Sequence, residues 1–241
     1  MATLRKQQPT GAASRRNLLV PAVAAAVVVA LLVAASLMRS GDSGSNGSSS
    51  APGEIEALLA GIPQDRTVLG SPEASVTLIQ FEDLQCPVCK RYQQNAFPGI
   101  VREYVRSGKV KLRFVGMTFI GDDSAKALSY VVAAGAQGKL WQLADALYAQ
   151  QGGENKGWVT DELLETLARQ LDLDHAKLRA DASGAAVEQQ VSSMEAEASQ
   201  REIPGTPWFY VQVGDAEPYE IRWSSLELDE FRTILDDALA G

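Results

Sequence analysis

The sequence predicts an α/β domain that carries an inserted helical block and follows a single membrane-spanning helix. Three observations predict this class. Short β-branched runs alternate with helical spacing, in the order β-α-β and, near the C-terminus, β-β-α. Between these two parts lies a block rich in Ala, Leu, Gln and Glu, over residues 121–202. Near the N-terminus, residues 18–38 contain no charge at all.

The uncharged run, LLVPAVAAAVVVALLVAASLM, is long enough to cross a bilayer. As a helix its 21 residues would span about 31 Å, close to a hydrocarbon core of about 30 Å. Pro21 lies in the first turn, where no helical hydrogen bond is lost. Basic residues precede the run: Arg5, Lys6, Arg15 and Arg16. The positive-inside rule therefore predicts a single-pass cell-membrane protein with residues 1–17 in the cytoplasm and the remainder exported.

A cleaved secretory signal and a buried core helix are the two alternatives for this run. Small residues at Ala34, Ala35 and Ser36 resemble the cleavage site of a secretory signal, although the apolar part of such signals usually spans about 7–15 residues. A buried helix of a soluble core fits poorly with a run that is apolar on all sides and follows a basic segment. An anchor and a cleaved signal would both export the domain.

The chain after the apolar run divides into a linker and one acidic domain. Residues 39–53 are Gly/Ser-rich and predict a flexible linker, and residues 54–241 are long enough for one substantial core. Residues 1–39 contain five basic residues and no acidic ones. The chain beyond Arg39 therefore has 17 Lys and Arg against 30 Asp and Glu. This balance argues against nucleic acid and anionic lipid as partners of the domain.

The first half of the domain predicts a β-α-β unit. Residues 75–82, SVTLIQFE, suit a buried strand, and residues 109–115, KVKLRFV, alternate as a second strand. A helix is expected from Pro87 to about Ser107, closed by Gly108. Such a unit implies parallel strands with a right-handed crossover. The run RTVLG, residues 66–70, could add an edge strand.

The second half predicts the inserted helices and a β-β-α ending. Helix starts are expected at Thr160 and Asp174, and breaks at QGGENKG, residues 151–157, and at Gly184. Residues 207–213 and 219–223 predict an antiparallel pair of strands. Residues 226–239 predict a closing amphipathic helix.

The two cysteines stand three residues apart in FEDLQCPVCKRY, at the end of the first buried strand. Pro87 suits the first helical position, which places Cys86 at the helix N-cap, where free N–H groups and the helix dipole favour its thiolate. Cys89, one turn inside the helix, is placed to resolve a mixed disulfide. Zinc would need about four ligands, and the one His in the chain, His175, is far along the sequence, at a predicted helix start on the surface. A zinc site shared in a dimer and an inert structural disulfide remain alternatives.

A second signal is IPGTPWF, residues 203–209, in which Pro207 opens a predicted strand. The composition of this segment does not distinguish a cis from a trans bond. Trp141, Tyr148, Trp158 and Trp208 are expected to pack in the core or to line a substrate face, and Trp208 directly follows the proline.

A strand that ends in CPVC, a helical insertion of about 80 residues, and GTP before a β-β-α ending resemble the DsbA-like branch of the thioredoxin superfamily, in particular its membrane-anchored bacterial members. The resemblance covers nearly all of residues 54–241 and implies a thioredoxin fold. It implies that Cys86 is the nucleophile and Cys89 the resolving thiol, that Pro87 and Val88 begin the active-site helix, and that Thr206-Pro207 is cis. It also implies a substrate groove beside Gly205 and Trp208, with backbone pairing near Thr206.

The sequence departs from the family pattern at two positions. Where the family often carries a buried acid, six residues before the first cysteine, this chain has Gln80, whose amide cannot act as a base. Glu82 and Asp83 could aid proton transfer instead, although a solvated charge at the strand end is the expectation for each. Strong oxidants of the family carry His between the cysteines, where this chain has Val88, so a less stabilised thiolate and a less oxidising disulfide are expected.

The sequence therefore predicts an extracytoplasmic thiol–disulfide oxidoreductase that donates disulfides to reduced secreted or envelope proteins and is reoxidised by a membrane partner. Its only redox group would be the Cys86–Cys89 disulfide, with no further cofactor. A monomer is expected, because the sequence contains no dimerisation module. A reductase or isomerase with the same two cysteines, and a non-catalytic, tethered peptide-binding module, are the alternatives.

Overall fold

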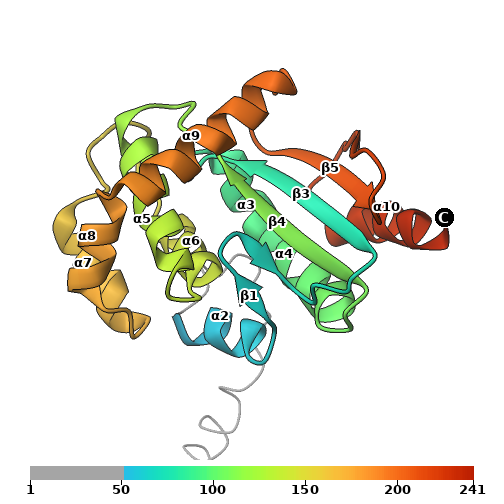
Figure 1. Cartoon of the computed structure of the whole chain (residues 1–241), viewed down its shortest axis with the longest axis horizontal. Coiled ribbons are helices and arrows are strands. Elements are labelled where there is room, and N and C mark those ends of the chain that lie inside the picture. Colours follow the sequence, from blue (N-terminus) through green and yellow to red (C-terminus); the bar gives the residue numbers. More distant parts are fainter. Residues whose placement is uncertain (1–51) are drawn as a thin grey trace, which may run out of the picture. The chain divides into compact units, whose positions relative to one another are not determined.

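The computed structural model describes residues 52–241, and Figure 1 shows their arrangement. The predicted cytoplasmic segment, the membrane helix at 18–38 and most of the linker lie outside the described residues. Within residues 52–241, no helix is both long and apolar enough to cross a membrane. The described part begins with helix α2, Pro52–Leu59.

A six-stranded sheet with the order β1-β2-β4-β3-β5-β6 forms the centre of the domain. Its strands are β1 (Gln64–Asp65), β2 (Val68–Leu69), β3 (Val76–Glu82), β4 (Val110–Gly116), β5 (Trp208–Val213) and β6 (Tyr219–Glu220). Strand β3 pairs parallel with β4 and antiparallel with β5, and all of its residues are buried. The predicted central strand and its parallel partner are thus confirmed. The strand predicted within residues 66–70 forms as β2 and pairs antiparallel with β4, but the prediction that it is an edge strand is wrong, because β1 pairs with its other side and forms the edge of the sheet.

The connection from β3 to β4 corrects the prediction of one continuous helix to about Ser107. It consists of α3 (Pro87–Asn95), α4 (Phe97–Ile100) and a π-helical turn over Val101–Val105. Pro98 has no N–H for the i→i−4 bond that a continuous helix would require, which accounts for the interruption. Gly108, with φ of 74°, closes the segment as predicted, because a positive φ costs glycine little.

Five helices occupy the predicted insertion: α5 (Asp122–Gly135), α6 (Leu140–Ala149), α7 (Asp161–Gln170), α8 (His175–Ala182) and α9 (Ala185–Gln200). The side chains of Thr160 and Asp174 cap α7 and α8 as predicted, by accepting the backbone N–H groups of Leu163 and Lys177. In Figure 1, α5 to α8 gather at one side of the sheet, and α9 runs back towards β4, against which it packs. The insertion therefore returns the chain to the sheet at β5.

The C-terminal part forms the predicted antiparallel pair and helix, with one correction. Strand β6 covers only Tyr219–Glu220, not 219–223, because the chain then turns towards α10 (Leu228–Ala240). The carboxylate of Glu230 accepts the backbone N–H groups of Ser224 at 2.6 Å and Ser225 at 2.7 Å, so these donors are used by the turn rather than by a sheet ladder. Helix α10 packs on β3 and β5.

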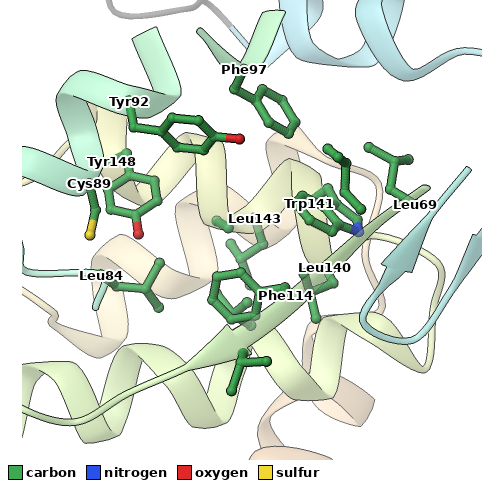
Figure 2. Packing of buried hydrophobic residues seen from close by; sticks show 14 of the residues in the cluster. Leu69, Leu84, Cys89, Tyr92, Phe97, Phe114, Leu140, Trp141, Leu143 and Tyr148 are labelled. Carbon is green, nitrogen blue, oxygen red and sulfur yellow. The ribbon is translucent and has the colours of Figure 1, made fainter. Parts of the chain in front are cut away.

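One continuous core joins the sheet to the insertion. The ring of Trp141 in α6 stacks on Phe97 at 5.7 Å and meets Phe114 of β4 edge-on at 6.0 Å. Figure 2 shows this packing, together with Cys89, Tyr92 and Tyr148, which lie in the same buried cluster. The insertion is therefore packed against the sheet and against the helical connection that carries the cysteines.

Candidate active site

Cys86 and Cys89 lie where β3 passes into α3, at the position that the sequence predicts. Cys86 is the N-cap of α3, with extended φ and ψ of −72° and 119°, and Pro87 begins the helix. The Cys89 backbone N–H points at Cys86 Sγ, at 3.4 Å. Both cysteines are free thiols in this structure. Cys86 is 5% exposed and Cys89 is fully buried, so only Cys86 can meet a partner from solution.

The loop before β5 brings a second segment to the Cys86 thiol. The Thr206–Pro207 peptide bond is cis, and the thiol of Cys86 donates a hydrogen bond to the Thr206 carbonyl oxygen at 3.2 Å. Gly205, Thr206 and Trp208 are partly exposed and Pro207 is buried. Residues 120 positions apart thus form one site, with partly exposed Val88 beside it.

The two thiols differ in acidity. A hydrogen bond with the Cys89 side chain is the largest effect on the Cys86 thiol and lowers its pKa from 9.0 to about 6, against the opposing effect of burial. The side chain of Thr206 and the backbone N–H groups of Cys89 and Val88 add to this lowering. Burial raises the pKa of Cys89 well above 9.0. Cys86 therefore carries the thiolate near neutral pH even though Val88 stands where a histidine donor could have been.

Glu82 and Asp83 are not the solvated charges expected from the sequence. Glu82 is 1% exposed and Asp83 is fully buried, because α6 and the start of α5 cover the end of β3. Burial raises the pKa of Glu82 to about 8, against the lowering effect of a 2.7 Å hydrogen bond from the Tyr148 hydroxyl. The charge of Glu82 also acts on Cys89, so the two side chains are coupled.

Gln80 and Asp83, the polar residues on either side of Phe81 and Glu82, do not offer a free carboxyl group to the cysteines. Gln80 is fully buried, and neither atom of its amide has a hydrogen-bond partner among the described residues. Asp83 is fully engaged in structure: its carboxylate accepts the N–H groups of Gln85 and Ile120 and the hydroxyl of Ser124, at 2.6–2.9 Å. Glu82 is therefore the carboxyl group of this strand that remains available to the cysteines.

A set of amides that the sequence did not indicate holds the segment before Cys86. The side chain of Gln85 donates to Ser124 and Asn155, both at 3.0 Å, and accepts the Asn155 N–H at 2.6 Å. Gln151 donates to the carbonyl oxygens of Leu84 at 2.9 Å and Cys86 at 3.2 Å. We call Gln85, Gln151 and Asn155 the amide clasp. The sequence shows QGGENKG only as a break between helices, and no pattern in it predicts these long-range bonds.

His175 begins α8, in the insertion, and is partly buried. Trp141 and Tyr148 belong to the core, whereas Trp158 and Trp208 are partly buried against it. Among residues 52–241, no three His, Cys, Asp or Glu side chains are grouped closely enough to hold a metal ion.

The fold and the site define a class. A Cys-x-x-Cys pair at the N-terminus of the helix after the central strand, facing an X–Pro loop, is the arrangement of a DsbA-like thiol–disulfide oxidoreductase. A family model described as thioredoxin matches residues 63–237, and the chain belongs to this family.

Relatives and solved structures agree with this class. The chain is 28% identical, over 154 residues, to the probable disulfide bond formation protein D of Bacillus anthracis, covering 62% of this chain and 71% of that protein. The crystal structure of oxidised BdbD from Bacillus subtilis superposes with a TM-score of 0.63 at 26% identity, covering 73% of this chain and 94% of that one. The alpha-DsbA1 structure of Wolbachia pipientis, at a TM-score of 0.62 and 20% identity, covers 77% and 96% and shares the fold.

Proposed function

We propose that this protein donates the Cys86–Cys89 disulfide to reduced secreted or envelope proteins outside the cytoplasm. The observation that carries the proposal is the contrast between the two thiols. Cys86 has a pKa lowered to about 6, whereas burial raises that of Cys89. A stabilised Cys86 thiolate favours the reduced form of the enzyme, which makes the oxidised form a better oxidant.

The reaction begins with the oxidised enzyme. A client thiolate attacks Cys86 Sγ, the accessible sulfur, and the bond between the two enzyme sulfurs breaks, with Cys89 as the leaving thiolate. A second client thiolate then attacks the client sulfur of the mixed disulfide, and Cys86 leaves as the stabilised thiolate. Two electrons pass from the client to the enzyme. The client gains one disulfide, and the enzyme ends with two reduced sulfurs.

Glu82 is assigned the proton step at Cys89. A buried thiolate is costly, so the leaving Cys89 needs a proton where water has little access. With a pKa of about 8, Glu82 is mostly protonated at neutral pH and can supply that proton, while the Tyr148 hydroxyl fixes its carboxyl group. In reoxidation the ionised Glu82 takes the proton back. Glu82 thus takes the role of the buried acid that the family often carries at the position of Gln80.

The uncharged run at 18–38 supports a location at the membrane, with residues 1–17 in the cytoplasm and the acidic domain tethered outside. Reoxidation then requires a membrane partner that accepts two electrons from the dithiol. The flexible linker formed by residues 39–53 would keep the domain near such a partner. Both the location and the partner belong to the proposal.

The test is the reduction potential of the full-length protein in detergent, equilibrated against glutathione. Disulfide donation predicts a value nearer about −120 mV than about −270 mV. A thioredoxin-like value would move the assignment to a reductase, and the lack of any reversible couple would leave a binding module. In cells, Cys89→Ser should accumulate mixed disulfides through Cys86, whereas Cys86→Ser should accumulate none.

A further inference from the structure

A groove of about 450 Å³ lies beside the proposed active site. One wall is the loop after β4, with Met117, Thr118 and Phe119, and the other is the end of α9 and the following turn, with Glu195, Glu202 and Ile203. We call this surface the acidic groove. Each wall is connected through a short stretch of chain to a segment of the cysteine site.

Two features of the backbone place the groove near the cysteine site. The Met117 N–H donates to the carbonyl oxygen of Glu82 at 2.8 Å, which fixes the first wall to the strand that leads to Cys86. Ile203 of the second wall is three residues before Thr206, whose carbonyl oxygen accepts the Cys86 thiol. Three residues span at most about 10 Å even when fully extended, so Ile203 lies within about 10 Å of Thr206.

The groove combines exposed apolar surface with negative charge. Phe119 is 62% exposed, the largest exposed fraction of any bulky hydrophobic side chain in residues 52–241. Glu195 accepts a 2.6 Å hydrogen bond from the Thr118 hydroxyl, which holds its carboxylate at the wall, and Glu202 is exposed. Phe119 offers a bound polypeptide an apolar contact, and the two carboxylates beside it offer a negative charge.

No described residue that lines the groove is cationic. The nearby cations are engaged elsewhere: Glu197 binds Arg113 at 2.6 Å and Arg201 at 3.2 Å, and the Arg201 guanidinium lies 4.8 Å from the centre of the Tyr210 ring. The chain beyond Arg39 is also strongly acidic, with 17 Lys and Arg against 30 Asp and Glu. The negative charge of the groove and that of the chain beyond Arg39 therefore both favour a basic partner.

We propose that the acidic groove selects client segments that carry an apolar and a basic side chain two to four residues from the reactive cysteine. The client pairs as an extended strand beside Thr206, its cysteine meets Cys86, and its neighbouring residues enter the groove. The apolar side chain packs on Phe119, and the basic one lies between Glu195 and Glu202. This specificity rests on the proposed function.

The probes are two synthetic peptides, each with two cysteines and a Leu, that differ only in Lys or Glu three residues from the first cysteine. The measured quantity is the ratio of their oxidation rates by the oxidised full-length protein in detergent, at low salt. We expect the Lys peptide to react about three- to ten-fold faster, with the ratio falling towards one in high salt. A ratio measured within one preparation does not depend on how much of a variant is folded.

The double variant E195Q/E202Q should bring the ratio close to one. Glu188→Gln makes the same kind of change on an exposed residue of α9 outside the groove and should keep the wild-type ratio. Equal rates for both peptides in the wild type would overturn the inference, and so would a loss of selectivity in Glu188→Gln equal to that in E195Q/E202Q. If neither the peptides nor dithiothreitol reduced the enzyme, the proposed function itself would fail.

Discussion

The Tyr148 hydroxyl donates a 2.7 Å hydrogen bond to the carboxyl group of Glu82 in the interior of the domain, next to the fully buried Cys89. Figure 2 shows Tyr148 and Cys89 as members of the same buried cluster. Tyr148 belongs to the insertion and Glu82 to the central strand, so the inserted helices complete the environment of the resolving thiol. This arrangement has consequences that experiments can measure.

The first prediction concerns stability against pH. Glu82 holds its proton up to about pH 8 in the folded protein, whereas the unfolded chain loses it near 4.5. Unfolding therefore releases a proton between these values, and raising the pH through this window lowers the free energy of unfolding. Glu82→Gln has no proton to lose at this position, so its free energy of unfolding should not show this decrease. The difference in free energy of unfolding between the variant and wild type should therefore change in favour of the variant by on the order of 4 kcal/mol between pH 4.5 and pH 8.

Urea unfolding of wild type and variant at several pH values measures this difference directly. Comparison of the two proteins cancels the other titrating groups, including Asp145, whose pKa burial raises to about 6. Exposed Glu188→Gln serves as the control and should follow wild type. Parallel curves for wild type and Glu82→Gln would contradict a protonated, buried Glu82.

The second prediction concerns the reactive thiol. In the reduced protein, the rate of alkylation by iodoacetamide against pH should have a midpoint near 6, because only the Cys86 thiolate reacts. The largest cause of this low pKa is the hydrogen bond with Cys89, so Cys89→Ala should move the midpoint up towards 9.0. Cys89→Ser, which keeps a donor, should move it less. Identical midpoints in the two variants would show that the Cys89 hydrogen bond does not set the acidity.

Much of this site could be predicted from the sequence because its signals are local. Cys86 as N-cap and Pro87 at the first helical position follow from residue types and spacing, and the structure places both as expected. The α/β class followed from the order of strands and helices, and the thioredoxin fold from the family resemblance; the mixed sheet and the matching family model confirm both. Local patterns of this kind survive folding because each is favoured by the backbone of its own segment.

The burial of Glu82 could not be predicted, because it depends on which distant segment covers the strand end. A carboxyl group after a strand is usually solvated, and only the packing of α6 brings Tyr148, 66 residues away, over it. The break of the first helix between Asn95 and Phe97 was missed for a simpler reason: the helical pattern continues past Pro98 to Gly108, although Pro98 cannot donate the hydrogen bond of a continuous helix. The amide clasp depends on contacts across 65 to 70 residues and leaves no periodic signal.

The third prediction tests the amide clasp. Gln151 spans two carbonyl oxygens of the segment that leads into α3, those of Leu84 and Cys86. Gln151→Leu would leave these carbonyl groups without that donor and should lower the free energy of unfolding by about 1–3 kcal/mol. Hydrogen exchange in residues 84–89 should also become faster, because this backbone is held less firmly. Gln150→Leu, at the exposed neighbouring position, should change neither measurement.

The last prediction concerns Val88, between the two cysteines. Val88 is partly exposed and packs against the edge of the core, and its backbone N–H already helps to stabilise the Cys86 thiolate. Val88→His would add a ring N–H donor near the thiolate, and a hydrogen bond to a charged group contributes about 1.5–3 kcal/mol. This bond stabilises the reduced form alone, so the reduction potential should rise by about 30–60 mV.

Glutathione equilibration of the full-length protein in detergent measures this shift, and the alkylation midpoint of Cys86 should fall below its wild-type value in the same variant. Val88→Leu is the matched control, because it changes the side chain at the same position without adding a donor, and it should keep both values. The two measurements must move together, since a lower pKa of Cys86 and a higher potential both result from a more stable thiolate. A potential that rises while the alkylation midpoint stays fixed would mean that Val88→His acts on the oxidised enzyme rather than on the Cys86 thiolate.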